Sequence, residues 1–277
     1  VPWVEGQSMR PAQVAVVQWA DSQDDCDALV RACGDRAKEV SHLAARLLVA
    51  GCERGRFPDI SGFGGLAESQ FIGVRQRLVE VVILGIQTEA IAGDQAINCL
   101  LNFQEDPAEQ VCQGILRAMK VLCEREMKGG EAVSVAGVQL VLRMLDRAIA
   151  IPKFRQPLAR LSFSVLGHLM CDRPEVWPAL CDRARRLFRC VTLAQVDKKV
   201  MTAVLLRIAH TDSDFLRRMV YEDCFDAVNP LPPSNQLALV VAIIAEEGAG
   251  SDLVEAMIRY EKTPNRVKSR ILKARGI

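Results

Sequence analysis

Two stretches of the chain carry nearly the same pattern of apolar residues. Residues 164–190 read SVLGHLMCDRPEVWPALCDRARRLFRC, and residues 203–228 read AVLLRIAHTDSDFLRRMVYEDCFDAV. A shift of 40 residues superimposes Leu206 on Leu166. In both stretches the apolar positions return every three or four residues, as in an amphipathic helix, and a polar corner interrupts them. The pattern predicts a repeated helix–corner–helix unit.

Two further copies of this pattern flank the first pair. One is VVAIIAEEGAGSDLVEAMIRYE at 240–261, and the other is AINCLLNFQEDPAEQVCQGILRAMKVL at 96–122, where Pro107 takes the place of Pro174. Units at steps of about 36–40 residues predict an α-solenoid, in which each unit buries its apolar face against its neighbours. The residues expected to be buried between units are Leu166, Leu169, Leu180, Leu187, Leu206, Val220 and Ala227.

The composition agrees with an all-α protein. Half of the 277 residues are hydrophobic, which is enough for a sizeable core, and alternating strand patterns are absent. The formal net charge is +1, so no global charge draws the protein onto nucleic acid or membrane. The longest apolar run, LALVVAIIA at 237–245, is too short for a bilayer, and we expect no membrane span.

The residues typical of enzymes and metal sites are not arranged for such roles. The ten cysteines contain no CxxC pair, which indicates reduced, buried thiols in a cytoplasmic protein, or alternatively a nuclear one. His42, His168 and His210 lie far from any cysteine cluster that could hold zinc. The GxSxG, HExxH and Walker motifs are missing. We therefore expect no catalytic residue, no metal and no cofactor.

We expect a single helical-repeat domain over 1–277. Its clearest repeats lie in 96–128 and 163–262. The segment ERGRFPDISGFGGLAE, at 53–68, is rich in glycine and is predicted to be a surface loop insertion.

The last residues, 263–277, are predicted to form a basic helix that caps the repeat array. Thr263 is the expected N-cap and Pro264 the expected first helical residue. A narrow apolar stripe is expected at Val267, Ile271 and Leu272.

The corners NFQEDPAEQV, HLMCDRPEVW and IAHTDSDFLR resemble those of armadillo repeats. HEAT, TOG-type and MIF4G-type arrays share this degenerate pattern. Asp182 and Asp223 stand where armadillo repeats have the glycine between their second and third helices, which weakens armadillo relative to HEAT. The resemblance implies a right-handed α-solenoid that acts as a non-catalytic protein-interaction scaffold. It also implies that the last helix of each unit lines a concave surface, and these helices would be residues 113–126, 181–191, 222–229 and 264–275.

The arginines of the first stretch are the leading candidates for partner binding. Arg183, Arg186 and Arg189 share one helix face at the expected concave surface. Arginine forks suit carboxylates or phosphates, and three cations repel one another unless an anion relieves them. The expected partner is therefore an acidic peptide or helix. In the alternative interpretation this is a solvated convex face, paired with Asp182 and Glu175.

The chain end supplies a second group of candidates. Residues 259–277 carry seven basic side chains against Glu261 alone. Such a tail suits RNA, anionic lipid or an acidic protein tail, and an RNA-associated scaffold of MIF4G type is the alternative function. No aromatic residue follows Tyr260 in this basic run, which disfavours stacking on single-stranded bases. The tail residues expected to bind are Arg266, Arg270 and Lys273.

Overall fold

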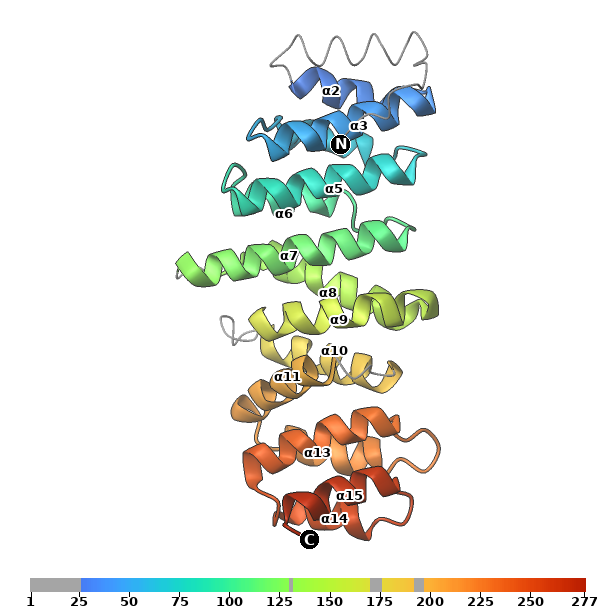
Figure 1. Cartoon of the computed structure of the whole chain (residues 1–277), viewed down its shortest axis with the longest axis vertical. Coiled ribbons are helices and arrows are strands. Elements are labelled where there is room, and N and C mark those ends of the chain that lie inside the picture. The colour runs from blue at the N-terminus through green and yellow to red at the C-terminus, as the bar shows by residue number, and fades with distance from the viewer. Residues whose placement is uncertain (1–25, 130–131, 170–175, 192–196) are drawn as a thin grey trace. The chain divides into compact units, whose positions relative to one another are not determined.

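The computed structural model describes residues 26–129, 132–169, 176–191 and 197–277, and these contain helices and no strand (Figure 1). The all-α prediction is confirmed. The chain divides into two compact units, one of Val1–Arg125 with Ser134–Leu140, and one of Glu126–Val133 with Val141–Ile277. The solenoid arrangement and the single continuous domain stay predictions. The predicted polar corner at 172–174 and Glu175 lie outside the described residues.

The first unit is a series of packed helices. α2 packs on α3, α3 on α5, and α5 on α6. Their apolar faces are buried, as the 3.6-residue period requires. The helices of this part are α2 (Cys26–Cys33), α3 (Lys38–Glu53), α4 (Phe63–Leu66), α5 (Ile72–Gln87), α6 (Gly93–Leu101) and α7 (Glu109–Gly129), which extends past the boundary.

The segment 53–68, predicted as a surface loop insertion, contains short helical turns, and its role as an insertion in the repeat array stays a prediction. It forms a 3₁₀ turn, Ile60–Gly62, that leads directly into α4. Phe63 is fully buried, and the side chain of Asp59 accepts a hydrogen bond from the Ser61 N–H at 2.9 Å. Burial of apolar side chains such as Phe63 stabilises these turns. This gain exceeds the conformational entropy that the glycines lose when they become ordered.

A buried ion pair fixes the corner between α6 and α7. Arg75, on α5, donates through Nε to Asp106 Oδ2 at 2.5 Å and through Nη2 to Oδ1 at 3.1 Å. The two side chains are 8% and 2% exposed. Asp106 also accepts the Ala108 N–H at 2.8 Å. The polar corner of this repeat is therefore held in place by Arg75, a cation on α5.

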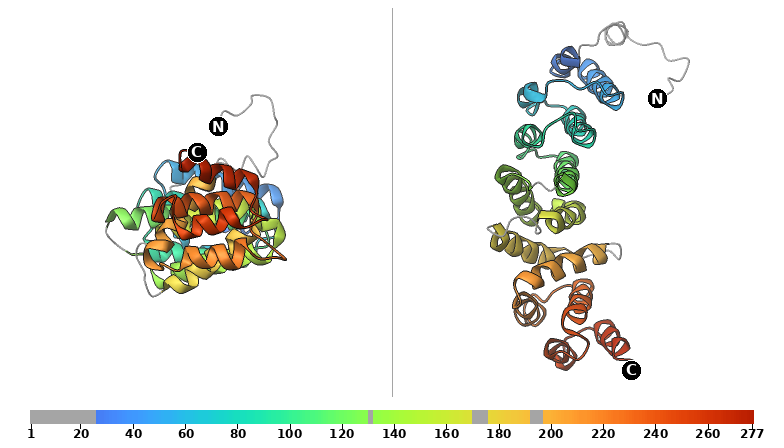
Figure 2. Two further views of the ribbon diagram at one scale, coloured as in Figure 1. Left: turned by 90° about the horizontal axis from the view of Figure 1, so that it is seen from below. Right: turned by 90° about the vertical axis from the view of Figure 1, so that its left-hand side faces the viewer.

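The second unit contains two rows of helices (Figure 2). One row is α9, α11, α13 and α15, and each of these helices packs on the next. The other row is α10, α12 and α14, and these helices pack against the first row: α10 on α9, α12 on α11, and α14 on α13 and α15. The helices are α8 (Val135–Ala150), which begins in the first unit, α9 (Pro152–Leu169), α10 (Trp177–Cys190), α11 (Asp197–Thr211), α12 (Phe215–Arg218) with a π-helical turn at Met219–Cys224, α13 (Pro233–Glu247), α14 (Asp252–Arg259) and α15 (Asn265–Ala274).

Each repeated stretch joins the second helix of one pair to the first helix of the next. Residues 164–190 hold the end of α9 and all of α10, and residues 203–228 hold most of α11, α12 and the π-helical turn. Burial was predicted correctly for five residues, all at most 1% exposed: Leu166, Leu169, Leu180, Leu187 and Val220. It was wrong for Leu206, which is half-buried on an outer face of α11, and for Ala227, which is exposed beyond the π-helical turn.

The basic helix at the chain end forms one residue later than predicted. α15 begins at Asn265, and Pro264 occupies the N-cap position in place of Thr263. Val267 and Ile271 are fully buried, whereas Leu272 is 37% exposed. Leu272 lies about 100° around the helix from Ile271 and points away from the stripe of Val267 and Ile271.

Candidate binding surfaces

The arginines of α10 are already paired with carboxylates of the same unit. Arg183 Nη2 donates to Asp146 Oδ2 at 3.0 Å. Arg186 Nη1 lies 4.0 Å from Asp146 Oδ1 and 3.8 Å from Asp182 Oδ2, and its side chain is 53% exposed. Both arginines therefore reach the end of α8.

Arg189 points to a different neighbour. Its Nη1 donates to Asp223 Oδ1 at 2.9 Å and its Nη2 to Asp226 Oδ2 at 2.9 Å, so it faces the π-helical turn and the loop after it. Arg185 also donates to Asp223, at 2.7 Å, and this hydrogen bond is the main reason that the pKa of Arg185 is raised. The Asp223 side chain is fully buried, so the two arginines compensate its burial.

The expectation that these arginines repel one another until a partner arrives was wrong. Sequence spacing placed Arg183, Arg186 and Arg189 together, but the carboxylates of Asp146 and Asp223 neutralise them within the fold. The concave surface shared by α10 and α15 stays a prediction; the two helices lie in different rows of the second unit. A binding role for the three α10 arginines stays a prediction, without the argument from repulsion.

A groove lies on the row formed by α11, α13 and α15. It has a volume of about 560 Å³. Its wall comes from two helices, since Thr202, Ala203 and Leu206 lie on α11, and Leu237, Ala238 and Val241 lie on α13. We call it the basic groove, and its lining residues are Lys199, Thr202, Ala203, Leu206, Leu237, Ala238, Val241 and Arg270.

Contacts from the other row hold the start of α13 beside the groove. Asn235 is fully buried, and its Nδ2 donates to the carbonyls of Phe188 at 2.5 Å and Val191 at 2.6 Å. These carbonyls belong to the end of α10, where a helix lacks internal partners for its last C=O groups. Asn235 thereby ties the start of α13 to the end of α10.

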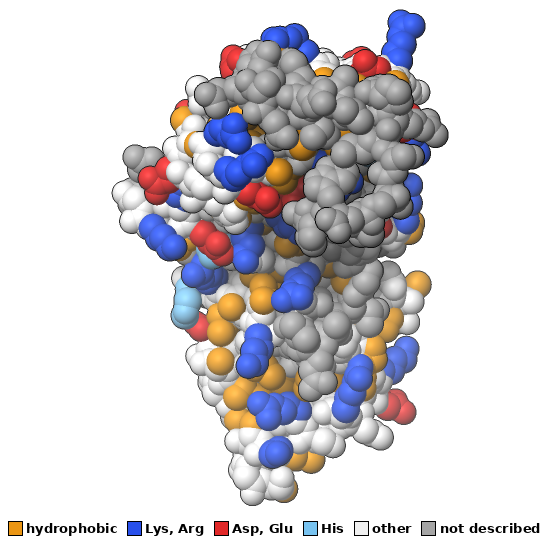
Figure 3. Space-filling view, turned by 45° about the horizontal axis from the view of Figure 1, so that its top comes forward, with side chains coloured by type: hydrophobic (Ala, Val, Ile, Leu, Met, Phe, Trp, Pro, Cys, Tyr) orange, Lys and Arg blue, Asp and Glu red, His pale blue; other side chains and the backbone are white. Residues whose placement is uncertain are grey.

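The cations around the groove are exposed and unneutralised. Arg266, Arg270 and Lys273 follow one face of α15, and Lys199 lies on α11. None of the four makes an ion pair with the part of the chain that the structure describes. The lower part of the surface in Figure 3 shows basic side chains beside hydrophobic ones, with few acidic groups.

The sequence predicted some of the basic residues of this groove but not its apolar wall. The α15 cations were predicted as binding residues, and the structure brings Arg270 to the groove, with Arg266 and Lys273 one turn to either side. Lys199 and the apolar wall were missed. No local sequence pattern indicated this wall, because it forms only where α11 and α13 pack on each other.

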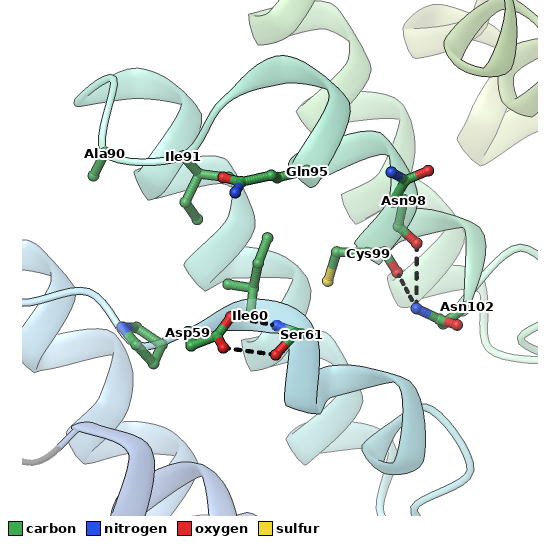
Figure 4. A pocket seen from close by; sticks show the side chains of 10 residues that line it. Asp59, Ile60, Ser61, Ala90, Ile91, Gln95, Asn98, Cys99 and Asn102 are labelled. Atoms are coloured by element: carbon green, nitrogen blue, oxygen red, sulfur yellow. Dashed lines mark hydrogen bonds between the residues drawn. The ribbon is translucent and has the colours of Figure 1, made fainter.

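A second hollow, of about 420 Å³, lies in the first unit between the 3₁₀ turn and α6 (Figure 4). Burial raises the pKa of the Cys99 thiol there to about 12, so it stays protonated. Asp59 binds the N–H and hydroxyl of Ser61, which hold the pKa of its carboxyl below the usual value. Asn102 Nδ2 donates to two carbonyls of its own helix. Several polar groups of this hollow are thus engaged within the chain.

The described residues contain no cluster of three or more potential metal ligands and no disulfide. Among the described helices, none is both long and apolar enough to cross a membrane.

Comparison with known proteins finds no match to this chain among family models, curated proteins or solved structures.

Proposed function

We propose that this chain is a non-catalytic protein-interaction scaffold that binds an acidic partner protein at the basic groove. The observation that carries the proposal is an apolar groove bordered by unneutralised cations. Apolar surface supplies affinity, and exposed charges select the partner and speed its association. The carboxylate-paired arginines of α10 offer no comparable unsatisfied charge.

The proposed architecture is a right-handed α-solenoid of armadillo or HEAT type. The pair α14 with α15, whose helices pack on each other, supports two-helix units of the HEAT kind, in which stacked helices present one continuous face. The protonated, buried thiols support a reducing location, cytoplasmic or nuclear.

RNA is the second candidate ligand, because Arg266, Arg270 and Lys273 form an exposed basic row. The groove itself favours protein. It is lined by aliphatic side chains and contains no aromatic ring on which a base could stack.

The test is affinity capture from a cell lysate, run in parallel with and without nuclease treatment. The bait is the wild-type chain or the variant Arg266→Glu/Arg270→Glu/Lys273→Glu, with Arg259→Glu as the control because Arg259 is 81% exposed and outside the groove. We expect acidic proteins that the wild type and control retain and the triple variant loses. Retention that is equal for all baits would contradict the proposal, and retention that requires intact RNA would favour the RNA alternative.

A further inference from the structure

We infer that the occupant of the basic groove is an amphipathic α-helix with acidic residues beside its apolar stripe. The inference rests on the proposed function and specifies the form of the partner. Three properties of the groove point to a helix: its hydrogen-bonding capacity, its shape and its charge.

The groove has few groups that could satisfy an extended backbone. Among its lining side chains only Thr202, Lys199 and Arg270 can form hydrogen bonds. An extended segment buried there would bring one N–H and one C=O per residue into apolar surroundings without partners. A helix satisfies these groups internally and presents only side chains to the groove.

The walls of the groove are suited to helix packing. α11 and α13 lie side by side, and each contributes a half-buried aliphatic side chain, Leu206 or Val241; Ala203, on α11, is small and exposed. Small residues allow close approach, and the larger ones form the ridges into which a third helix packs. An occupant with apolar residues at i, i+3, i+4 and i+7 matches this surface.

The charges restrict the occupant further. Lys199 and Arg270 lie on different helices, so an occupant between α11 and α15 meets a cation from each. Arg266 and Lys273 extend the positive edge along α15. Carboxylates beside the apolar stripe would pair with these groups, whereas a basic helix would be repelled.

The first measurement compares probes by fluorescence anisotropy at moderate salt with the full chain. The test probe is a stapled peptide of about 18 residues with a leucine stripe flanked by Glu, since shorter unstapled helices are marginal in water. The comparison probes are the same composition with the stripe scrambled, the same sequence unstapled with two central prolines, a Lys-for-Glu version, and oligouridine RNA. We expect the test probe to bind at least about tenfold more tightly than each of the others.

The second measurement uses paired variants with the test probe. Ala203→Glu places a carboxylate in the groove, and Ala245→Glu makes the same change at an exposed site of α13 outside it. Arg270→Glu and Arg259→Glu form the corresponding charge pair. We expect about tenfold weaker binding for each groove variant and a change below about twofold for each control, with helical circular dichroism retained by all four.

Equal binding of the proline peptide would overturn the helix, and tighter binding of RNA would overturn the protein occupant. Equal effects of groove and control variants would overturn the location. If lysate capture depends on the α15 cations but the helical probe is not preferred, the inference fails and the proposed function stands. If capture does not depend on them either, both fail.

Discussion

Asp223 is fully buried and is reached by Arg185 and Arg189. Replacing Arg185 by Ala leaves this carboxylate with a single cationic partner, so we expect the free energy of unfolding to fall by roughly 1–3 kcal/mol. Arg186→Ala, one residue along α10, removes a half-exposed side chain with only long ion pairs and should change stability by less than about 0.5 kcal/mol. Urea unfolding of the two variants compares them directly. Equal losses would show that Asp223 does not need Arg185.

The lowered pKa of Asp226 predicts how the free energy of unfolding depends on pH. Its carboxylate accepts the backbone N–H groups of Val228 and Asn229, at 2.9 and 3.1 Å, and these bonds lower its pKa, with Arg189 adding to the effect. Because this pKa is lower in the folded state than in the unfolded state, the ionised carboxylate stabilises the fold at pH values above the unfolded-state pKa. This stabilisation is lost as the pH falls through the folded-state pKa. The stability difference between wild type and Asp226→Asn should therefore shrink below about pH 4. Urea midpoints measured from pH 7 to pH 3 test this, and a constant difference would contradict it.

At the scale of helices, the two matched leucines of the repeat have different roles. Leu166, on α9, is fully buried, so Leu166→Ala should lower the free energy of unfolding by roughly 2–5 kcal/mol through lost burial and the cavity it leaves. Leu206, its counterpart on α11, is half-buried in the groove wall. Leu206→Ala should cost less stability and should weaken the helical probe. Thermal unfolding and peptide binding of the same two variants separate these effects, and a larger stability loss at Leu206 would show that it is a core residue.

At the scale of the whole molecule, the division into two units predicts local responses to mutation. Arg75→Ala leaves the buried Asp106 carboxylate without its cation and should cost roughly 3–5 kcal/mol, whereas Arg77→Ala, on the exposed side of α5, should cost little. Hydrogen exchange should then accelerate in α5, α6 and the start of α7 and stay unchanged in α13 and α15. Acceleration spread evenly over all helices would indicate a single cooperative unit.

The sequence was sufficient to predict what depends on neighbours within a few residues. Helical periodicity identified the buried Leu166 and Leu180, and charge counting identified the α15 cations. Contacts between distant residues were not predicted. Arg189 meets Asp223, 34 residues away, and Asn235 meets Phe188, 47 residues away, and no local pattern indicates such pairs. The groove depends on such contacts, because its apolar wall exists only where α11 and α13 are adjacent.

The distribution of thiols provides a native set of probes for local opening. Buried cysteines occur in α2, α3, α6, α7 and the π-helical turn, so no engineered label is needed to follow these elements. An alkylating reagent can reach a buried sulfur only when its own segment opens, which converts the alkylation rate at Cys33, Cys99 or Cys224 into an opening frequency for that segment. Cys190, which is exposed, serves as the internal standard for reagent activity. Peptide mass spectrometry of one unmodified sample would then rank the helices by how often each one opens.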